Sequence, residues 1–198
     1  MTITYRLDDS LYVNMTNRCS NRCDFCIRNF GEGIGESGDL WLDREPTVEE
    51  ASGDIIKNAG GCRELVFCGY GEPLMRFDDV VAVIKKVKPI INIPVRINTN
   101  GQADLIHGRE TSRELAGLVD TVSISLNAPN AKEYEEVCHS DYGEKAYDAI
   151  LKYAADCKKY VPNVVFSVVD VMDSEDIEKC RKIAEQTGVK FRVRKMIK

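Results

Sequence analysis

The sequence predicts an α/β protein built as an open partial (β/α)6 barrel of the TIM type. Segments of strand character alternate with segments of helical periodicity, a pattern that favours parallel strands joined by right-handed crossovers. Each strand-and-helix unit needs about 30 residues. The 198 residues therefore supply about six units, fewer than the eight of a closed barrel. A flat, doubly wound sheet is the alternative arrangement.

Six segments have the apolar and β-branched character of strands. They span residues 10–16, 64–68, 95–99, 121–126, 163–169 and 190–194. Helices are expected from Thr47, over 77–88, around 112–118, over 130–137 and over 143–160, and Ser174 should cap the last helix. Thr47 and Glu50 form a capping box, Pro89 should close the second helix, and Gly188 stands where the last helix should end. A glycine-rich loop is expected over residues 17–45.

Composition and charge narrow the function classes. We expect one domain over residues 1–198, because 43% of the residues are hydrophobic and 30% are charged, as in globular proteins. The net charge of −5 argues against a large nucleic-acid interface, which requires a basic face. No apolar run reaches the roughly eighteen residues of a membrane helix, and residues 1–9 lack the pattern of a secretory signal. We therefore expect a cytoplasmic protein without membrane association.

Three of the eight cysteines lie close together, directly after the first expected strand. Cys19, Cys23 and Cys26 have the spacing C-x3-C-x2-C. Three thiolates can bind three irons of a [4Fe-4S] cluster and leave the fourth iron open to an outside ligand. A structural zinc site would need a fourth ligand, and an electron-transfer ferredoxin would place a fourth cysteine nearby. Core packing is the expected role of the scattered cysteines, which are Cys62, Cys68, Cys138, Cys157 and Cys180.

Polar candidates follow two other expected strands. Gly69, Gly71 and Glu72 follow the second strand, where glycines permit close approach of a ligand and a carboxylate or carbonyl oxygen can accept hydrogen bonds. An ordinary Gly-Glu-Pro turn is the alternative. On the fourth strand, Ser125 and Asn127 alternate with apolar residues and share one face. If that face looks into the barrel, these side chains can bind a ligand or line a wet interior without one.

Further candidates depend on which way their side chains point. Phe25 could cover a cluster or pack elsewhere, and Asn100 could line the pocket or form part of an Asn-Gly turn. Arg192 and Arg194 share one face of the last strand, where they could bind a ligand carboxylate or an anionic substrate if the face looks inward. If it looks outward, they form a solvated edge. Substrate-pocket candidates on the loops after the third and fourth strands are His107, Arg109, His139 and Tyr142.

The cysteine spacing, with an aromatic residue before the last cysteine, resembles the motif of the radical SAM superfamily. Segment 67–73, FCGYGEP, is similar to the Gly-Gly-Glu-Pro motif of that superfamily and departs from it at Tyr70, where many members carry glycine. Segments 98–101 and 123–127 are similar to further strand-end patterns of the superfamily. Over nearly its full length, the chain resembles the TatD-associated radical SAM proteins. The matching stretches are residues 11–19, 26–30, 39–42, 98–101, 105–109 and 122–129.

The resemblance implies a [4Fe-4S] cluster on Cys19, Cys23 and Cys26, with S-adenosylmethionine (SAM) as the second cofactor. It implies reductive cleavage of SAM to a 5′-deoxyadenosyl radical that abstracts hydrogen from a substrate. The residues expected to contact SAM are Phe25, Gly69, Gly71, Glu72, Asn100, Ser125, Asn127 and Arg194.

The resemblance does not name a substrate, and we expect a small molecule acted on by a radical SAM oxidoreductase or modifying enzyme. Modification of a tRNA base or another nucleic-acid base and activation of a glycyl-radical partner are the enzymatic alternatives. A non-catalytic iron–sulfur redox or sensor protein is the alternative from another class. A flavodoxin- or ferredoxin-type protein is expected to supply the electron, and the family name suggests a functional link to a TatD-type nuclease.

Overall fold

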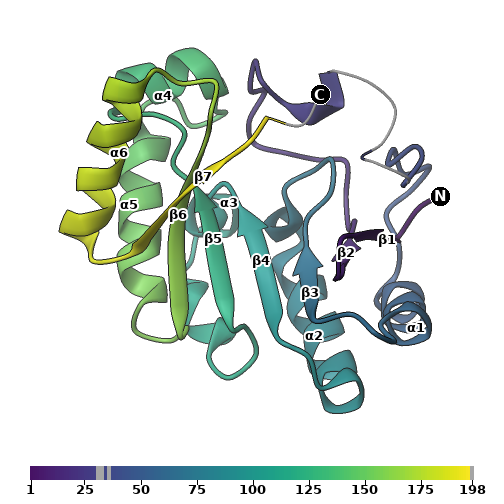
Figure 1. The fold of residues 1–198 in the computed structure, drawn as a ribbon. Coiled ribbons are helices and arrows are strands. Elements are labelled where there is room, and N and C mark those ends of the chain that lie inside the picture. The colour runs from purple at the N-terminus through teal and green to yellow at the C-terminus, as the bar shows by residue number, and fades with distance from the viewer. Residues whose placement is uncertain (30–33, 35–36, 197–198) are drawn as a thin grey trace.

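The computed structural model describes residues 1–29, 34 and 37–196, so residues 30–33 and 35–36 of the predicted loop lie outside the description. One seven-stranded sheet runs through the molecule, and its spatial order follows the chain (Figure 1). The strands are β1 (Thr4–Leu7), β2 (Ser10–Val13), β3 (Glu64–Phe67), β4 (Val95–Thr99), β5 (Thr121–Ser125), β6 (Asn163–Val169) and β7 (Lys190–Arg194). Strands β2 to β7 pair in parallel, whereas β1 and β2 form an antiparallel hairpin.

The sheet has the winding of a partial barrel. Each parallel strand lies beside the next strand of the chain, so the strand order never reverses as it would in a doubly wound sheet. Among the described residues, β1 and β7 are the two edges and the sheet does not close. The predicted open barrel is therefore confirmed. Strand β1, which adds a seventh strand at one edge, was not predicted from the sequence.

Helices connect the parallel strands. The α-helices of the described chain are α1 (Val48–Asn58), α2 (Phe77–Ile91), α3 (Ala103–His107), α4 (Ala131–Cys138), α5 (Lys145–Cys157) and α6 (Ser174–Thr187), and the 3-10 turns are η1 (Ile27–Asn29), η2 (Pro73–Arg76) and η3 (Ser112–Leu115). The predicted capping box is present at α1, where Glu50 N donates to Thr47 Oγ1 (3.1 Å) and Thr47 N donates to Glu50 Oε2 (2.9 Å). Gly188 ends α6 with a φ of 69°, as predicted.

Two expectations about helix boundaries were wrong, and one short helix was not predicted. Helix α2 continues through Pro89 to a left-handed cap at Asn92, because a proline in the last turn leaves the earlier backbone bonds intact. The N-cap of α6 is Asp173 rather than Ser174, and its side chain accepts a hydrogen bond from Asp176 N (2.9 Å). Helix α3 was not predicted, since a single turn leaves almost no periodic pattern.

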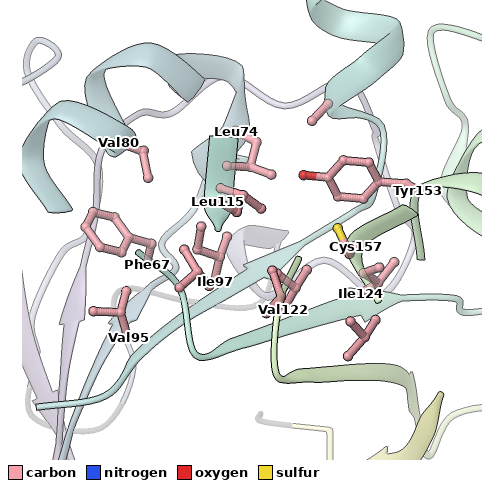
Figure 2. Packing of buried hydrophobic residues seen from close by; sticks show 14 of the residues in the cluster. Phe67, Leu74, Val80, Val95, Ile97, Leu115, Val122, Ile124, Tyr153 and Cys157 are labelled. Atoms are coloured by element: carbon pink, nitrogen blue, oxygen red, sulfur yellow. The ribbon is translucent and has the colours of Figure 1, made fainter. Parts of the chain in front are cut away.

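The hydrophobic core lies between the sheet and the helices (Figure 2). Ile97, Val122 and Ile124 of the strands are fully buried there with Val80 of α2 and Tyr153 of α5. Alternate strand residues point to the opposite face of the sheet, which is polar. The helices therefore cover one face, and the other face is left to line a cavity. No described helix has both the length and the apolar character needed to cross a membrane.

Candidate active site

A cavity of about 620 Å³ lies at the carboxyl ends of the parallel strands, a volume typical of small-molecule sites. The described residues 14–29, which follow β2, lie beyond these strand ends (Figure 1). Every cofactor and metal residue predicted from the sequence lines this cavity. They are Cys19, Cys23, Phe25, Cys26, Gly69, Gly71, Glu72, Asn100, Ser125, Asn127 and Arg194. The fold thus brings one loop and the ends of four strands to a single place.

The cysteine loop is held by backbone hydrogen bonds to the end of α4. Arg22 N donates to Cys138 O (2.9 Å), and Asp24 N donates to Val137 O (3.1 Å). These bonds lie on the two sides of Cys23. The loop is therefore fixed at its centre, although it has almost no regular secondary structure of its own.

A buried polar network anchors the same loop to the end of β4 and to α4. Gln102 Nε2 donates to Asn21 Oδ1 (2.9 Å) and to Tyr134 Oη (3.0 Å), while Asn21 Nδ2 also donates to Tyr134 Oη (2.8 Å). Ser20 Oγ donates to Gln102 Oε1 and Asn100 Nδ2 donates to Ser20 Oγ, both at 2.9 Å. All these atoms are buried, so the satisfied network fixes the loop position. Neither Gln102 nor Tyr134 was predicted from the sequence as a site residue.

The three loop thiols are free and partly accessible, and their electrostatic surroundings differ. Burial raises the pKa of Cys19 to about 12 and also raises the pKa of Cys26. A hydrogen bond between the Cys23 and Cys138 thiols lowers the pKa of Cys23 and raises that of Cys138. The Arg28 guanidinium acts to lower the pKa of all three loop thiols. A cation beside the loop thus favours the thiolate form that binds metal.

The scattered cysteines occupy two kinds of environment. Core packing is confirmed for Cys62, Cys157 and Cys180. Cys138 is also fully buried in the core, but its thiol contacts Cys23, which the sequence analysis did not anticipate. Core packing was wrong for Cys68, which lines the cavity because it lies two residues beyond Val66, on the inward face of the sheet.

Glu72 joins the end of β3 to the end of β4. Its side chain is 4% exposed, and its two carboxylate oxygens accept hydrogen bonds from Asn100 N (2.6 Å), Thr99 Oγ1 (2.7 Å) and Leu74 N (3.0 Å). Burial raises the pKa of Glu72 to about 7, although these three hydrogen bonds act in the opposite direction. The carboxylate therefore serves first as a structural acceptor, with one of its roughly four lone-pair positions left for a ligand.

The glycines of the FCGYGEP segment allow the cysteine loop to approach. A Cβ atom on Gly71 would lie 2.2 Å from Thr16 O and 2.6 Å from Arg18 O, and one on Gly69 would lie 2.1 Å from Asn14 Oδ1. Side chains at these positions would collide with the chain that leads into the cysteines. The glycines also line the cavity, so they serve the close packing of the site as well as access for a ligand.

The inward faces of β5 and β7 supply the opposite wall of the cavity. Ser125 and Asn127 point into it, as the alternation predicted, and Asn127 has a left-handed backbone with a φ of 53°. Arg192 and Arg194 also face inward, which decides between the two orientations left open by the sequence. Arg194 Nη2 donates to Ser125 Oγ at 3.5 Å.

None of the four loop candidates lines this cavity. They are His107, Arg109, His139 and Tyr142. His107 Nε2 instead bonds to Leu74 O (2.8 Å), and His139 Nε2 bonds to Asp24 Oδ1 (2.9 Å). Loops at the same end of the barrel point outward here, so proximity along the chain did not predict access to the cavity. Phe30, which belongs to the matching stretch 26–30, lies outside the described residues.

These residues fit an iron–sulfur cluster with a polar ligand beside it. Three thiols from one loop line the same cavity. In a [4Fe-4S] cluster each thiolate binds its own iron. Asn127 Oδ1 and Arg194 Nε are buried at the cavity without a hydrogen-bond partner in the described chain. A ligand with its own donors and acceptors would satisfy both atoms.

The chain is similar to curated enzymes of two kinds. A probable GTP 3′,8-cyclase of Thermococcus kodakarensis is 25% identical over 184 residues, which cover 90% of this chain and 54% of that protein. A probable dual-specificity RNA methyltransferase RlmN of Nostoc punctiforme is 30% identical over 149 residues, which cover 72% of this chain and 36% of that protein. The chain thus spans only about a third to a half of the length of these relatives.

The fold is also similar to that of solved proteins. The crystal structure of Streptococcus suis SuiB bound to S-adenosylmethionine superimposes with a TM-score of 0.66 at 17% identity, covering 95% of this chain and 38% of that chain. The sequence model of the radical SAM superfamily matches residues 13–187, which include the cysteine loop and strands β3 to β6. The chain therefore belongs to the radical SAM superfamily, whose members are enzymes that use a [4Fe-4S] cluster and S-adenosylmethionine.

Proposed function

We propose that this chain holds a [4Fe-4S] cluster on Cys19, Cys23 and Cys26 and uses SAM to modify a small molecule. The supporting observation is that three loop thiols and the polar ends of four strands meet in one cavity. When bound, the cluster and SAM supply one-electron cleavage to a 5′-deoxyadenosyl radical, which removes a hydrogen atom from the substrate. The chain's own residues position these groups and exclude water.

The residues around the cavity offer complementary contacts for SAM. Asn127 Oδ1 is an acceptor without a partner in the described chain, and the Ser125 hydroxyl lies on the same face. Glu72 keeps one lone-pair position for an ammonium donor. Phe25 contributes apolar surface at the cavity, and Asn100 holds the loop through Ser20. These roles in SAM binding are part of the proposal.

A small molecule is the favoured substrate because the cavity has the size of a small-molecule site and the chain has a net charge of −5. The proposed electron donor is a flavodoxin- or ferredoxin-type protein, and the proposed compartment is the reducing cytoplasm, where free thiols persist. A functional link to a TatD-type nuclease belongs to the same proposal and comes from the resemblance of the sequence.

Anaerobic reconstitution with iron and sulfide, followed by dithionite and SAM, tests the proposal. We expect release of 5′-deoxyadenosine by the wild-type protein and loss of both iron and product in Cys23→Ala. Cys62→Ala is the matched control, since Cys62 is buried in the core away from the cavity and should retain both. Normal iron content and cleavage in Cys23→Ala, or one zinc ion in place of the cluster, would reject the proposal.

A further inference from the structure

Three arginines gather on the inward face of the sheet. Arg96 lies on β4, Arg192 and Arg194 lie on β7, and all three line the same cavity as the cysteine loop. In the parallel register Arg192 lies opposite Ser167 and Arg194 lies opposite Val169. Because residues two apart on a strand share a face, the two β7 guanidinium groups project to the same side.

The positive charge of this cluster is only partly balanced. Arg96 Nη2 pairs with Glu64 Oε2 at 2.9 Å. Within the described residues, Arg194 contacts Ser125 Oγ at 3.5 Å, its Nε has no partner, and no carboxylate lies within ion-pair distance of Arg192 or Arg194. Two guanidinium groups therefore face the cavity without a counter-charge from the described chain.

This arrangement is unfavourable for the protein alone. Burial lowers the pKa of Arg194, and the nearby charges of Arg192 and Arg96 act in the same direction. Arg192 remains exposed to solvent, whereas the more buried Arg194 loses hydration and gains in return only the long hydrogen bond to Ser125 Oγ (3.5 Å). An anion in the cavity would restore hydrogen bonds to the guanidinium groups and remove their mutual repulsion.

We propose that Arg192 and Arg194, with Arg96 beside them, bind a divalent anionic group of the substrate, either a phosphate or a pair of carboxylates. The planar guanidinium fork matches such groups through paired hydrogen bonds. SAM carries a single carboxylate together with an ammonium and a sulfonium, so it would leave one of the two unpaired guanidinium groups uncompensated. The inference rests on the proposed function, because it places the substrate in the cavity that receives SAM.

The test is equilibrium dialysis of radiolabelled inorganic phosphate against the anaerobically reconstituted protein at constant ionic strength. We expect saturable binding that weakens about tenfold or more in Arg194→Met, since one charged donor pair is lost. Arg63→Met is the matched control, because Arg63 is 84% exposed, pairs with Asp9 and does not line the cavity. Iron content and thermal midpoint show whether each variant is folded and loaded.

The same dialysis in the presence of saturating SAM shows whether the guanidinium groups bind an anionic group of the substrate or the methionyl carboxylate of SAM. Phosphate affinity that changes less than about threefold with SAM bound supports a separate substrate subsite. Displacement of phosphate by SAM would assign the guanidinium groups to the methionyl carboxylate and overturn the inference. Equal phosphate affinity in wild type, Arg194→Met and Arg63→Met would also overturn it.

Malonate in the same dialysis tests whether a dicarboxylate fits as well as a phosphate. Displacement of phosphate by malonate, but not by sodium chloride at equal ionic strength, extends the subsite to dicarboxylates. If neither malonate nor sodium chloride displaces phosphate, the subsite is restricted to phosphate. A subsite for phosphate alone and a subsite that also accepts dicarboxylates both support the inference. Release of 5′-deoxyadenosine is measured on the same samples, so cleavage without phosphate binding rejects only this subsite. Phosphate binding without cleavage rejects only the proposed function.

Discussion

At the scale of single residues, Cys138 bears on how many thiols a cluster could use. Its buried thiol hydrogen-bonds to Cys23, while its backbone oxygen holds the cysteine loop. It belongs to the hydrophobic core on α4 and not to the loop that carries the other three thiols. We therefore assign Cys138 a packing role beside the cluster, which leaves the fourth iron open.

This assignment predicts that Cys138→Ala retains its iron and its cleavage of SAM, with a loss of about 1 kcal/mol in the free energy of unfolding. Iron content and the change in the electron paramagnetic resonance signal on adding SAM measure the result. Cys23→Ala, treated identically, is the comparison. If Cys138→Ala lost as much iron as Cys23→Ala, Cys138 would be a ligand and the three-thiolate site would be wrong.

Glu72 predicts a specific pH dependence of stability. Its pKa is raised from 4.5 to about 7 by burial, so the folded state binds the proton more tightly than the unfolded state. The contribution of this group is fully present below about pH 4.5 and is lost as the pH rises through about 7, a change of about 3 kcal/mol. The charge of Glu72 in turn acts to raise the pKa of the Cys19 and Cys68 thiols.

The measurement compares the free energy of unfolding of cluster-free wild type and Glu72→Gln between about pH 4 and 8. The difference, wild type minus variant, should decrease across this range, since only the wild type loses the proton. Parallel pH profiles for the two proteins would show that the pKa of Glu72 is not raised in the fold.

Individual site residues were predictable where they stood in a local motif. The three loop cysteines and Glu72 follow strand ends in short patterns, and the fold brings them to one cavity. Gln102 and Tyr134 could not be recognised, because their partners lie far away in the chain and neither residue belongs to a motif. The position of Gln102 directly after an Asn-Gly pair is a local pattern, but it does not reveal that the side chain is buried.

At the scale of elements, the contact between the FCGYGEP segment and the cysteine loop predicts the effect of a single methyl group. Gly71→Ala would place its Cβ against the backbone oxygens of Thr16 and Arg18, which cannot move without shifting the loop. We expect a loss of about 2 kcal/mol in stability and reduced cluster content. Chemical denaturation and iron analysis measure both quantities.

Gly53→Ala is the matched control for this prediction. Gly53 lies inside α1, and a Cβ atom added there would have no heavy atom within 4 Å beyond its own helix backbone and chain neighbours. The substitution should stabilise the protein by about 0.5–1 kcal/mol and leave the iron content unchanged. Equal behaviour of the two variants would show that the close approach at Gly71 has no role in the site.

Elements were predictable in proportion to their length and pattern. Strands β4, β6 and β7 match the predicted ranges, since apolar runs bounded by turn residues are clear signals. The hairpin strand β1 and the helix α3 were missed. Each has only four or five residues, and pairing or packing with distant segments stabilises it more than local preference does.

At the scale of the whole molecule, the sheet separates stability from chemistry. Its helix-covered face forms the core, and its inward face forms the polar cavity. Strand count and alternation were enough to predict an open barrel, because six units are fewer than the eight of a closed TIM barrel. The direction of Arg192 and Arg194 could not be predicted, since alternation fixes which residues share a face but not which face looks inward.

This separation predicts what removal of the cluster does to the fold. Exposure to air and a chelator should leave the far-ultraviolet circular dichroism spectrum nearly unchanged. The reason is that none of the three proposed cluster ligands is among the fully buried residues of the core between sheet and helices. Amide hydrogen exchange should accelerate in residues 18–29, where a few backbone and side-chain bonds hold the loop. Strands β4 to β6 should keep their protection.

The cluster-loaded protein kept without oxygen is the control. Uniform acceleration across the sheet, or loss of the circular dichroism signal, would mean that the cluster supports the whole fold and that the two faces are not energetically separate.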